Sequence, residues 1–153
     1  MRHDIPRHTV SVAAAVFDAS GRVLAICRED NGHWEPPGGL LEVGEGIHEG
    51  LAREVFEETG LLVEPVGLTG VYKNVVRGIV ALVFRCELVG GDVRRTVEAR
   101  EARWLTAEEV RSLMEEAYAV RLLDAFGEGP PRVRSHDGFN LLEHQEGLSL
   151  KLR

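Results

Sequence analysis

Six glutamates and one arginine fall within 23 residues, in the segment GLLEVGEGIHEGLAREVFEETGL from Gly39 to Leu61. On a helix with about 100° per residue, Glu54, Glu57 and Glu58 share one arc of about 100°. Glu54 and Glu58 form a like-charge i,i+4 pair, which destabilises an isolated helix. Glu58 also falls angularly between two apolar residues, so we expect it to be partly buried. Ionised carboxylates in such a place need compensation, and a hard divalent cation such as Mg²⁺ provides it. A solvated acidic helix face is the alternative interpretation.

A helix must carry this acidic face, and the sequence predicts one from Ile47 to Thr59. Ile47, Leu51 and Val55 repeat every four residues, and Gly60 ends the pattern. The other expected elements are strands over His8–Phe17, Arg22–Cys27, Leu61–Val76, Ile79–Val89 and Ala102–Leu105. A turn at 18–21 joins the first two strands and predicts a hairpin.

Thr106 and Glu109 fit a capping box, which predicts a second helix continuing to about Phe126. The polar tail 132–153 is expected to contain either one hairpin around His136-Asp137-Gly138 or a disordered segment. Strands on both sides of one helix, together with the late helix, indicate a mixed sheet covered by helices.

Composition narrows the function classes without choosing one. The chain has 153 residues, which fits one domain, and its 18 Lys and Arg against 25 Asp and Glu give a formal net charge of −7. That charge argues against generic binding to nucleic acid or an anionic membrane. It permits phosphate substrates, because a multivalent cation reverses the local sign.

The N-terminal residues, the apolar runs and the two cysteines indicate the compartment of the protein and the redox state of its thiols. The N-terminal residues are polar and show no secretory signal, and no apolar run reaches the about 18–20 residues that span a bilayer. We therefore expect a cytoplasmic protein. Cys27 and Cys86 lie inside apolar runs without metal-type spacing, which favours reduced core thiols.

The acidic segment resembles the signature of the Nudix hydrolases at every fixed position. That signature is G, five residues, E, seven residues, then R-E-U-x-E-E-x-G-U, where U is bulky and aliphatic. The matching residues are Gly39, Glu45, Arg53, Glu54, Val55, Glu57, Glu58, Gly60 and Leu61. The resemblance implies an α/β (α+β) fold, an α/β/α sandwich with a mixed β-sheet and a loop-helix-loop motif, as a single domain over 1–153.

The resemblance also implies a reaction and a metal site. Family members hydrolyse a nucleoside diphosphate linked to another group, so a small-molecule nucleotide is the expected substrate. Glu54, Glu57 and Glu58 would bind Mg²⁺ or Mn²⁺ together with the carbonyl of Gly39. Arg53 would orient these carboxylates, since its i,i+4 relation to Glu57 permits an ion pair.

Three glutamates compete for the role of general base, and one supports the loop. Many family members use an acid in the loop before a strand that carries an aromatic residue. Here the candidates are Glu98 and Glu101, ahead of Trp104, and the family pattern favours Glu98. In other members a box glutamate does this work, which leaves Glu57 as the alternative. Glu45 carries over as a supporting carboxylate where the loop joins the helix.

Substrate contacts are predicted at two further residues. Arg28 stands where family members often place an arginine that contacts phosphate, although a solvated strand end is the alternative. Trp34 would either stack on a nucleobase or pack under the box. The marks of ADP-ribose, dinucleoside polyphosphate and NADH subgroups do not match: position 76 is Val, for instance, where ADP-ribose pyrophosphatases have proline.

Two other functions remain open at this stage, as does the choice between a monomer and a homodimer. One is a nucleotide sensor that has lost catalysis, although such modules usually lose box residues and this box is intact. The other is hydrolysis of RNA 5′ ends, for which Arg94, Arg95, Arg100 and Arg103 could form a basic patch against the overall charge of −7.

Overall fold

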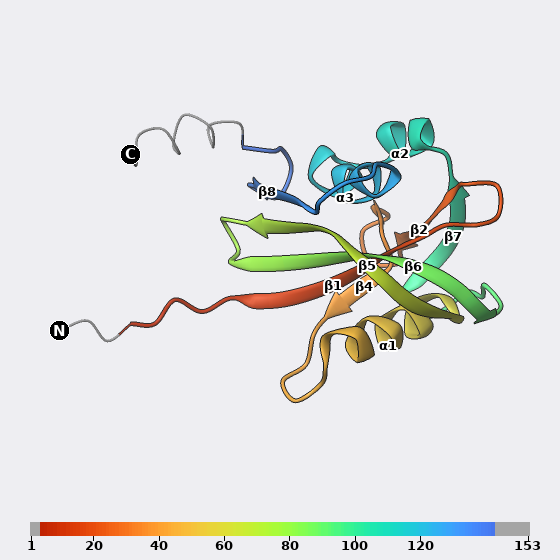
Figure 1. Ribbon diagram of the computed structural model, residues 1–153, viewed down its shortest axis with the longest axis horizontal. Coiled ribbons are helices and arrows are strands. Elements are labelled where there is room, and N and C mark those ends of the chain that lie inside the picture. Colours follow the sequence, from red (N-terminus) through yellow and green to blue (C-terminus); the bar gives the residue numbers. More distant parts are fainter. Residues whose placement is uncertain (1–3, 143–153) are drawn as a thin grey trace.

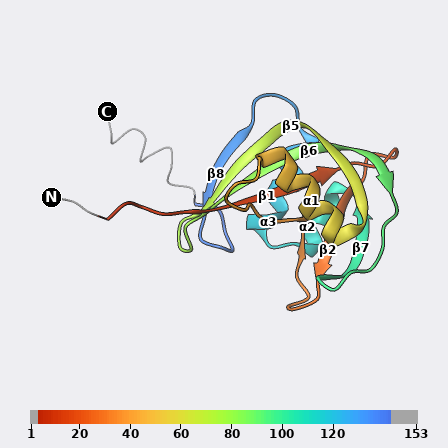
Figure 2. The same cartoon turned by 90° about the horizontal axis from the view of Figure 1, so that it is seen from below.

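The computed structural model describes residues 4–142, in which strands lie between helices on either side (Figure 1). One helix, α1 (Ile47–Thr59), covers one face, while α2 (Ala107–Leu113) and α3 (Glu116–Phe126) cover the other. The turned view places α1 in front of the strands and α3 behind them (Figure 2). This is the α/β/α sandwich that the sequence predicts.

Two sheets form the middle layer. The strands are β1 (Thr9–Val16), β2 (Val23–Arg28), β3 (Trp34–Glu35), β4 (Gly38–Leu40), β5 (Leu61–Asn74), β6 (Ile79–Gly91), β7 (Ala99–Leu105) and β8 (Arg132–His136). The larger sheet has the order β4-β1-β6-β5-β8 and the smaller one β3-β2-β7. Strands β1 and β6 are parallel whereas β5 and β6 are antiparallel, so the larger sheet is mixed.

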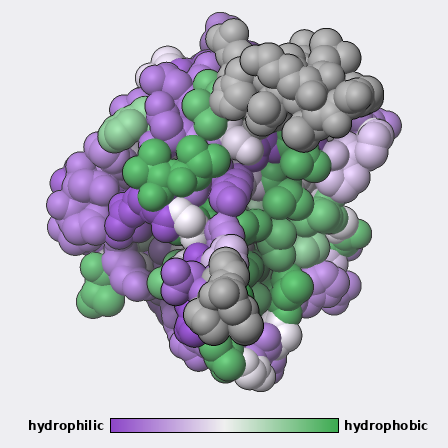
Figure 3. Space-filling view, turned by 90° about the vertical axis from the view of Figure 1, so that its left-hand side faces the viewer, coloured by the Kyte–Doolittle hydropathy of each residue, from purple (hydrophilic) through white to green (hydrophobic). Residues whose placement is uncertain are grey.

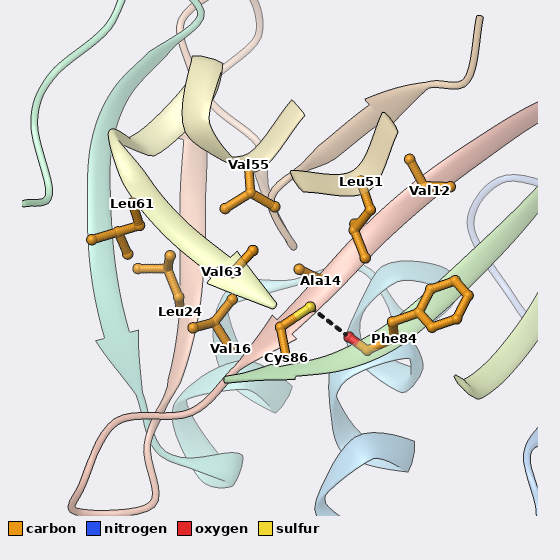
Figure 4. Close-up of a cluster of buried hydrophobic side chains, with 10 residues drawn as sticks. All are labelled: Val12, Ala14, Val16, Leu24, Leu51, Val55, Leu61, Val63, Phe84 and Cys86. Carbon is orange, nitrogen blue, oxygen red and sulfur yellow. Dashed lines mark hydrogen bonds between the residues drawn. The ribbon is translucent and has the colours of Figure 1, made fainter. Parts of the chain in front are cut away.

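Strand β1 distributes its side chains to both helical layers. Val12, Ala14 and Val16 join the buried cluster beneath α1, where Leu51 and Val55 pack against them (Figure 4). Ala15 points to the opposite face and joins the cluster beneath α2 and α3. This alternation follows from the two-residue period of a strand, and it makes β1 the centre of the sandwich.

The helix α1 has the bounds that the sequence predicts, because both of its ends are well specified. At the start, the Gly46 amide donates to Glu49 Oε1 (3.0 Å). At the end, Gly60 adopts a left-handed conformation with φ of 82°, which glycine adopts without steric cost.

Two predictions of local structure are wrong. Strands β1 and β2 do not form a hairpin, because they belong to different sheets and share only an isolated bridge between Phe17 and Val23. The expected single helix to Phe126 is two helices, α2 and α3, that break after Leu113. The Ala117 amide donates to the Phe139 carbonyl (3.0 Å), so a distant segment takes one of the bonds at the start of α3.

The tail contains part of the predicted hairpin. Strand β8 pairs in parallel with β5, and an isolated bridge joins His136 to Leu141 after the turn. The Val75 amide donates to the His136 carbonyl (2.9 Å), which brings the β5–β6 turn beside this loop. Exposed apolar side chains at this end include Val76 and Phe139, and Figure 3 shows apolar and polar side chains side by side there. The rest of the tail, 143–153, lies outside the described residues.

Both cysteines are buried and free, as predicted for core thiols. Across residues 4–142, no helix combines the length and the apolar character needed to cross a membrane.

Candidate active site

The acidic face of α1 lies against the backbone of β4. A Cβ atom built on Gly39 would collide with the carboxylate of Glu54, and one built on Gly38 would collide with the Val12 carbonyl. Glycine at position 39 leaves room for the Glu54 carboxylate, and glycine at position 38 permits the close approach of the β1 backbone. The backbone of the two glycines therefore lies directly against the carboxylates of Glu54 and Glu58.

Glu58 is buried, with 7% of its surface exposed. Its Oε1 accepts a hydrogen bond from the Gly38 amide (2.8 Å). Burial raises the pKa of Glu58 to about 8, and the negative charges of Glu98, Glu54 and Glu35 act in the same direction. A carboxylate in this state is stabilised by a nearby cation, which fits the chemistry of a metal ligand.

Arg53 organises the other side of the cluster. Its guanidinium donates two hydrogen bonds to Glu45, from Nε to Oε2 (2.9 Å) and from Nη2 to Oε1 (2.7 Å). Its Nη1 lies 3.2 Å from Glu57 Oε1 and 3.4 Å from Glu54 Oε2. The hydrogen bonds from Arg53 lower the pKa of Glu45 to about 2. One arginine thus contacts three carboxylates.

The three box glutamates are not equally close together. Glu54 is largely buried, and burial raises its pKa, whereas half of the Glu57 side chain is exposed beside Arg53. Among residues 4–142, no three His, Cys, Asp or Glu side chains form a cluster that is closed enough to hold an ion. The structure therefore brings Glu54 and Glu58 together at β4 and leaves Glu57 at the rim. Carboxylate oxygens are nevertheless the ligands that a hard cation prefers.

The loop before β7 is tied to the end of α1. The Arg94 amide donates to the Thr59 carbonyl (2.9 Å), and Thr96 Oγ1 donates to the Glu58 carbonyl (3.0 Å). These bonds bring the loop to the acidic cluster. No local pattern predicts these bonds, because the partners are far apart in the chain and each bond uses a main-chain group.

Glu98 belongs to this loop and lies at the cluster. Its charge raises the pKa of both Glu54 and Glu58. With Glu58 and Arg28 it lines a cavity of about 340 Å³. Glu101 differs, because β7 begins at Ala99 rather than at Ala102, and Glu101 pairs with Cys27 inside the strand. The expectation that both glutamates lie in a polar loop is wrong for Glu101.

Arg28, at the end of β2, is held by two carboxylates. Its guanidinium donates to both oxygens of Asp30 (2.9 and 2.7 Å) and lies 3.5 Å from Glu35. It lines the same cavity as Glu98. Trp34 is half-buried against the core beneath α2 and α3, with the Arg103 guanidinium 5.4 Å from its ring centre, so its packing is established.

The known proteins that resemble this chain belong to one family. The family model described as NUDIX domain matches residues 7–126. A MutT-like protein of Streptomyces ambofaciens is 57% identical over 137 residues, covering 90% of this chain and 89% of that protein. An ADP-ribose pyrophosphatase of Methanocaldococcus jannaschii is 29% identical over 69% of this chain and 67% of its own length. The crystal structure of an ADP-ribose pyrophosphatase from Streptococcus suis superposes with a TM-score of 0.72 at 20% identity, covering 83% of this chain and 99% of that one, and this likeness concerns the fold alone.

Proposed function

The chain belongs to the Nudix family, and from that premise we propose that it cleaves a phosphoanhydride bond in a nucleoside diphosphate linked to another group. A nucleoside triphosphate, ADP-ribose or a sugar nucleotide would be the substrate. The observation that carries the proposal is the buried Glu58 carboxylate on the Gly38 amide, close to Glu54 and Glu98. A buried carboxylate beside two further acidic groups is costly unless a cation compensates its charge.

The residues that we propose to hold Mg²⁺, or Mn²⁺ in its place, are Glu54, Glu57, Glu58 and the carbonyl of Gly39. When bound, the ion supplies positive charge that neutralises the phosphate oxygens as the bond breaks. Arg53 keeps Glu57 and Glu54 oriented and reduces their mutual repulsion. Glu45 in turn fixes Arg53 through its paired hydrogen bonds.

We propose Glu98 as the general base that takes a proton from the attacking water. Its support is its place in a loop tethered to α1 and its electrostatic contact with Glu54 and Glu58. Glu57 remains the competing base, because its half-exposed carboxylate can also meet water. Arg28, beside Glu98, would bind a phosphate group, and Trp34 remains a weaker candidate for stacking on a base.

An RNA 5′ end is a less favourable substrate, because the four arginines of the expected basic patch have protein partners. Arg94 lies over the Phe56 ring, Arg103 over Trp34, Arg100 against Cys27, and Arg95 beside Glu29. The residues 1–153 are proposed to act as one domain on a small nucleotide.

A phosphate-release screen tests the proposal. It would compare nucleoside triphosphates, ADP-ribose, sugar nucleotides and dinucleoside polyphosphates with Mg²⁺, with Mn²⁺ and in excess EDTA. Pyrophosphate released from nucleoside triphosphates would be revealed by adding inorganic pyrophosphatase, and monophosphates released from ADP-ribose or sugar nucleotides by adding a phosphatase. We expect turnover of at least one class, dependent on the divalent ion. Turnover of none, or full turnover in EDTA, would contradict the proposal.

A further inference from the structure

A separate cavity of about 200 Å³ lies on the α3 side of β4. The residues of its wall that matter here are Arg28, Glu35, Gly38, Gly39, Tyr118 and Arg121. Gly38 and Gly39 line this cavity and also lie against Glu58 and Glu54. Whatever occupies the cavity is therefore separated from the acidic cluster by a single glycine strand.

The most unusual group in this wall is Arg121, on α3. Only 9% of its surface is exposed, and its Nε has no hydrogen-bond partner among residues 4–142. Its Nη2 lies 3.4 Å from His136 Nε2. The rings of Tyr118 and Tyr72 flank the guanidinium, with centroids 4.6 and 5.8 Å from its central carbon. Within the described part of the chain, a buried cation is thus surrounded by aromatic rings and an imidazole, without a carboxylate in ion-pair contact.

The carboxylates of neighbouring elements form their ion pairs with other arginines. Asp124, one turn along α3, accepts from the Tyr72 hydroxyl (2.8 Å) and from two nitrogens of Arg134 (both 2.7 Å). Glu35 lies 3.5 Å from Arg28, and its charge also acts on Arg121, although the two do not form an ion pair within the described residues. A buried charge whose hydrogen-bonding groups are left unpaired costs several kcal/mol in general. A ligand that enters the cavity with acceptor atoms would remove that cost.

We propose that Arg121 is a specificity-determining residue, whose guanidinium donates to a pair of coplanar acceptor atoms of the nucleotide substrate. This proposal rests on the proposed function. The fork of N–H groups matches two acceptors and no donor, a pattern found in phosphate oxygens and in the O6/N7 edge of a 6-oxopurine, but not in adenine, which presents a donor at N6. The ring of Tyr118 lies beside the same guanidinium. A volume of about 200 Å³ is below that of pockets for whole drug-sized ligands, so the cavity takes one part of a nucleotide.

Calorimetric titration with GMP, AMP and inorganic phosphate in Mg²⁺ tests Arg121 without turnover, because none of these probes has a phosphoanhydride bond. The proteins are the wild type, Arg121→Met, Arg121→Lys and the control Arg111→Met, whose arginine is exposed on α2. We expect Arg121→Met to weaken binding by about tenfold or more, as for loss of a charge-assisted hydrogen bond. Arg121→Lys keeps the charge without the fork and should fall between the wild type and Arg121→Met.

The probes separate the two sources of acceptors. If Arg121 reads a base edge, the loss is larger for GMP than for AMP and absent for phosphate. If it binds phosphate oxygens, all three probes weaken by the same factor. Wild-type binding of every probe by Arg121→Lys and by any folded Arg121→Met, or no binding of any probe to the wild type, overturns the inference. Since binding is measured directly, a chain that binds GMP but fails the hydrolysis screen would refute only the proposed function.

Discussion

The Gly38 amide donates a 2.8 Å hydrogen bond to Oε1 of Glu58, a residue twenty positions further along the chain. This bond joins β4 to the last turn of α1 and holds a carboxylate in the interior beside a backbone edge. It fixes the position of the Glu58 carboxylate against β4.

Glu58→Gln should flatten the pH dependence of stability in the absence of divalent ions. Burial raises the pKa of Glu58 from 4.5 to about 8, so between these values the folded state holds a proton that the unfolded state has lost. The resulting stabilisation is complete below the unfolded pKa and is lost as the pH rises through the folded one. The wild type should lose up to about 1.4 kcal/mol per pH unit in this window.

Urea unfolding in EDTA, from about pH 5 to pH 8, measures this slope. Glu64→Gln, an exposed change on β5, is the control and should keep the wild-type slope. Equal slopes for the wild type and Glu58→Gln would show that Glu58 titrates normally. Adding Mg²⁺ should raise the melting temperature most at the high-pH end, because the ion binds the folded state.

Gly39→Ala should lower kcat by about a hundredfold or more and change the melting temperature little. The new Cβ would take the place of the Glu54 carboxylate, which is the flexible end of a side chain and can move at little cost to the fold. Moving a metal ligand, however, removes several kcal/mol of transition-state stabilisation. Steady-state kinetics and thermal unfolding separate the two effects.

The matched control for this change is Gly67→Ala, since a Cβ at Gly67 meets nothing within 4 Å. It should behave as the wild type in both measurements. A fully active Gly39→Ala enzyme would remove Gly39 from the metal site.

Glu57→Gln should reduce kcat by more than about a hundredfold although Glu57 is the most exposed of the three box glutamates. Its ion pair with Arg53 is half-exposed and contributes little to stability, so the melting temperature should change little. Kinetics at saturating Mg²⁺ is the decisive measurement. Wild-type turnover there would mean that Glu57 is neither a ligand nor the base.

Glu98→Gln should slow kcat strongly and abolish the acidic limb of the pH–rate profile, whereas Glu101→Gln should be nearly silent. Glu98 lines the cavity beside Glu58, but Glu101 is exposed within β7. Both variants would be assayed at saturating Mg²⁺, so that a weakened metal site is not mistaken for a lost base. If Glu98→Gln turns over normally, the base is Glu101 when Glu101→Gln is slow, and Glu57 when neither of the two variants is slow.

Local patterns in the sequence predicted the parts of the fold that local interactions determine. The bounds of α1 follow from its apolar repeat and from Gly60, and the capping box of Thr106 and Glu109 is present with both hydrogen bonds. The break between α2 and α3 could not be predicted in this way, because Met114 and Glu115 favour helices. It depends on the distant Phe139 carbonyl, which takes the Ala117 amide.

Some residues of the candidate site could likewise be predicted from local spacing, whereas others depend on how distant segments pack. The acidic face of α1 was visible as a spacing of glutamates, since one helix carries it. The separation of Glu98 from Glu101 was not visible, because it depends on where β7 begins against β2. Arg121 gave no signal either, since a lone arginine in an amphipathic helix usually faces solvent. Its burial arises only when α3 packs beside β1.

The two glycines of β4 form a wall between the glutamates of α1 and the cavity that Arg121 lines. A ligand that displaces this wall from the Arg121 side also changes the distance between the Gly38 amide and Glu58. If Arg121 binds the nucleotide and Glu58 binds the ion, as proposed, the two affinities would be coupled, and thermodynamic reciprocity requires that each ligand change the affinity for the other by the same factor.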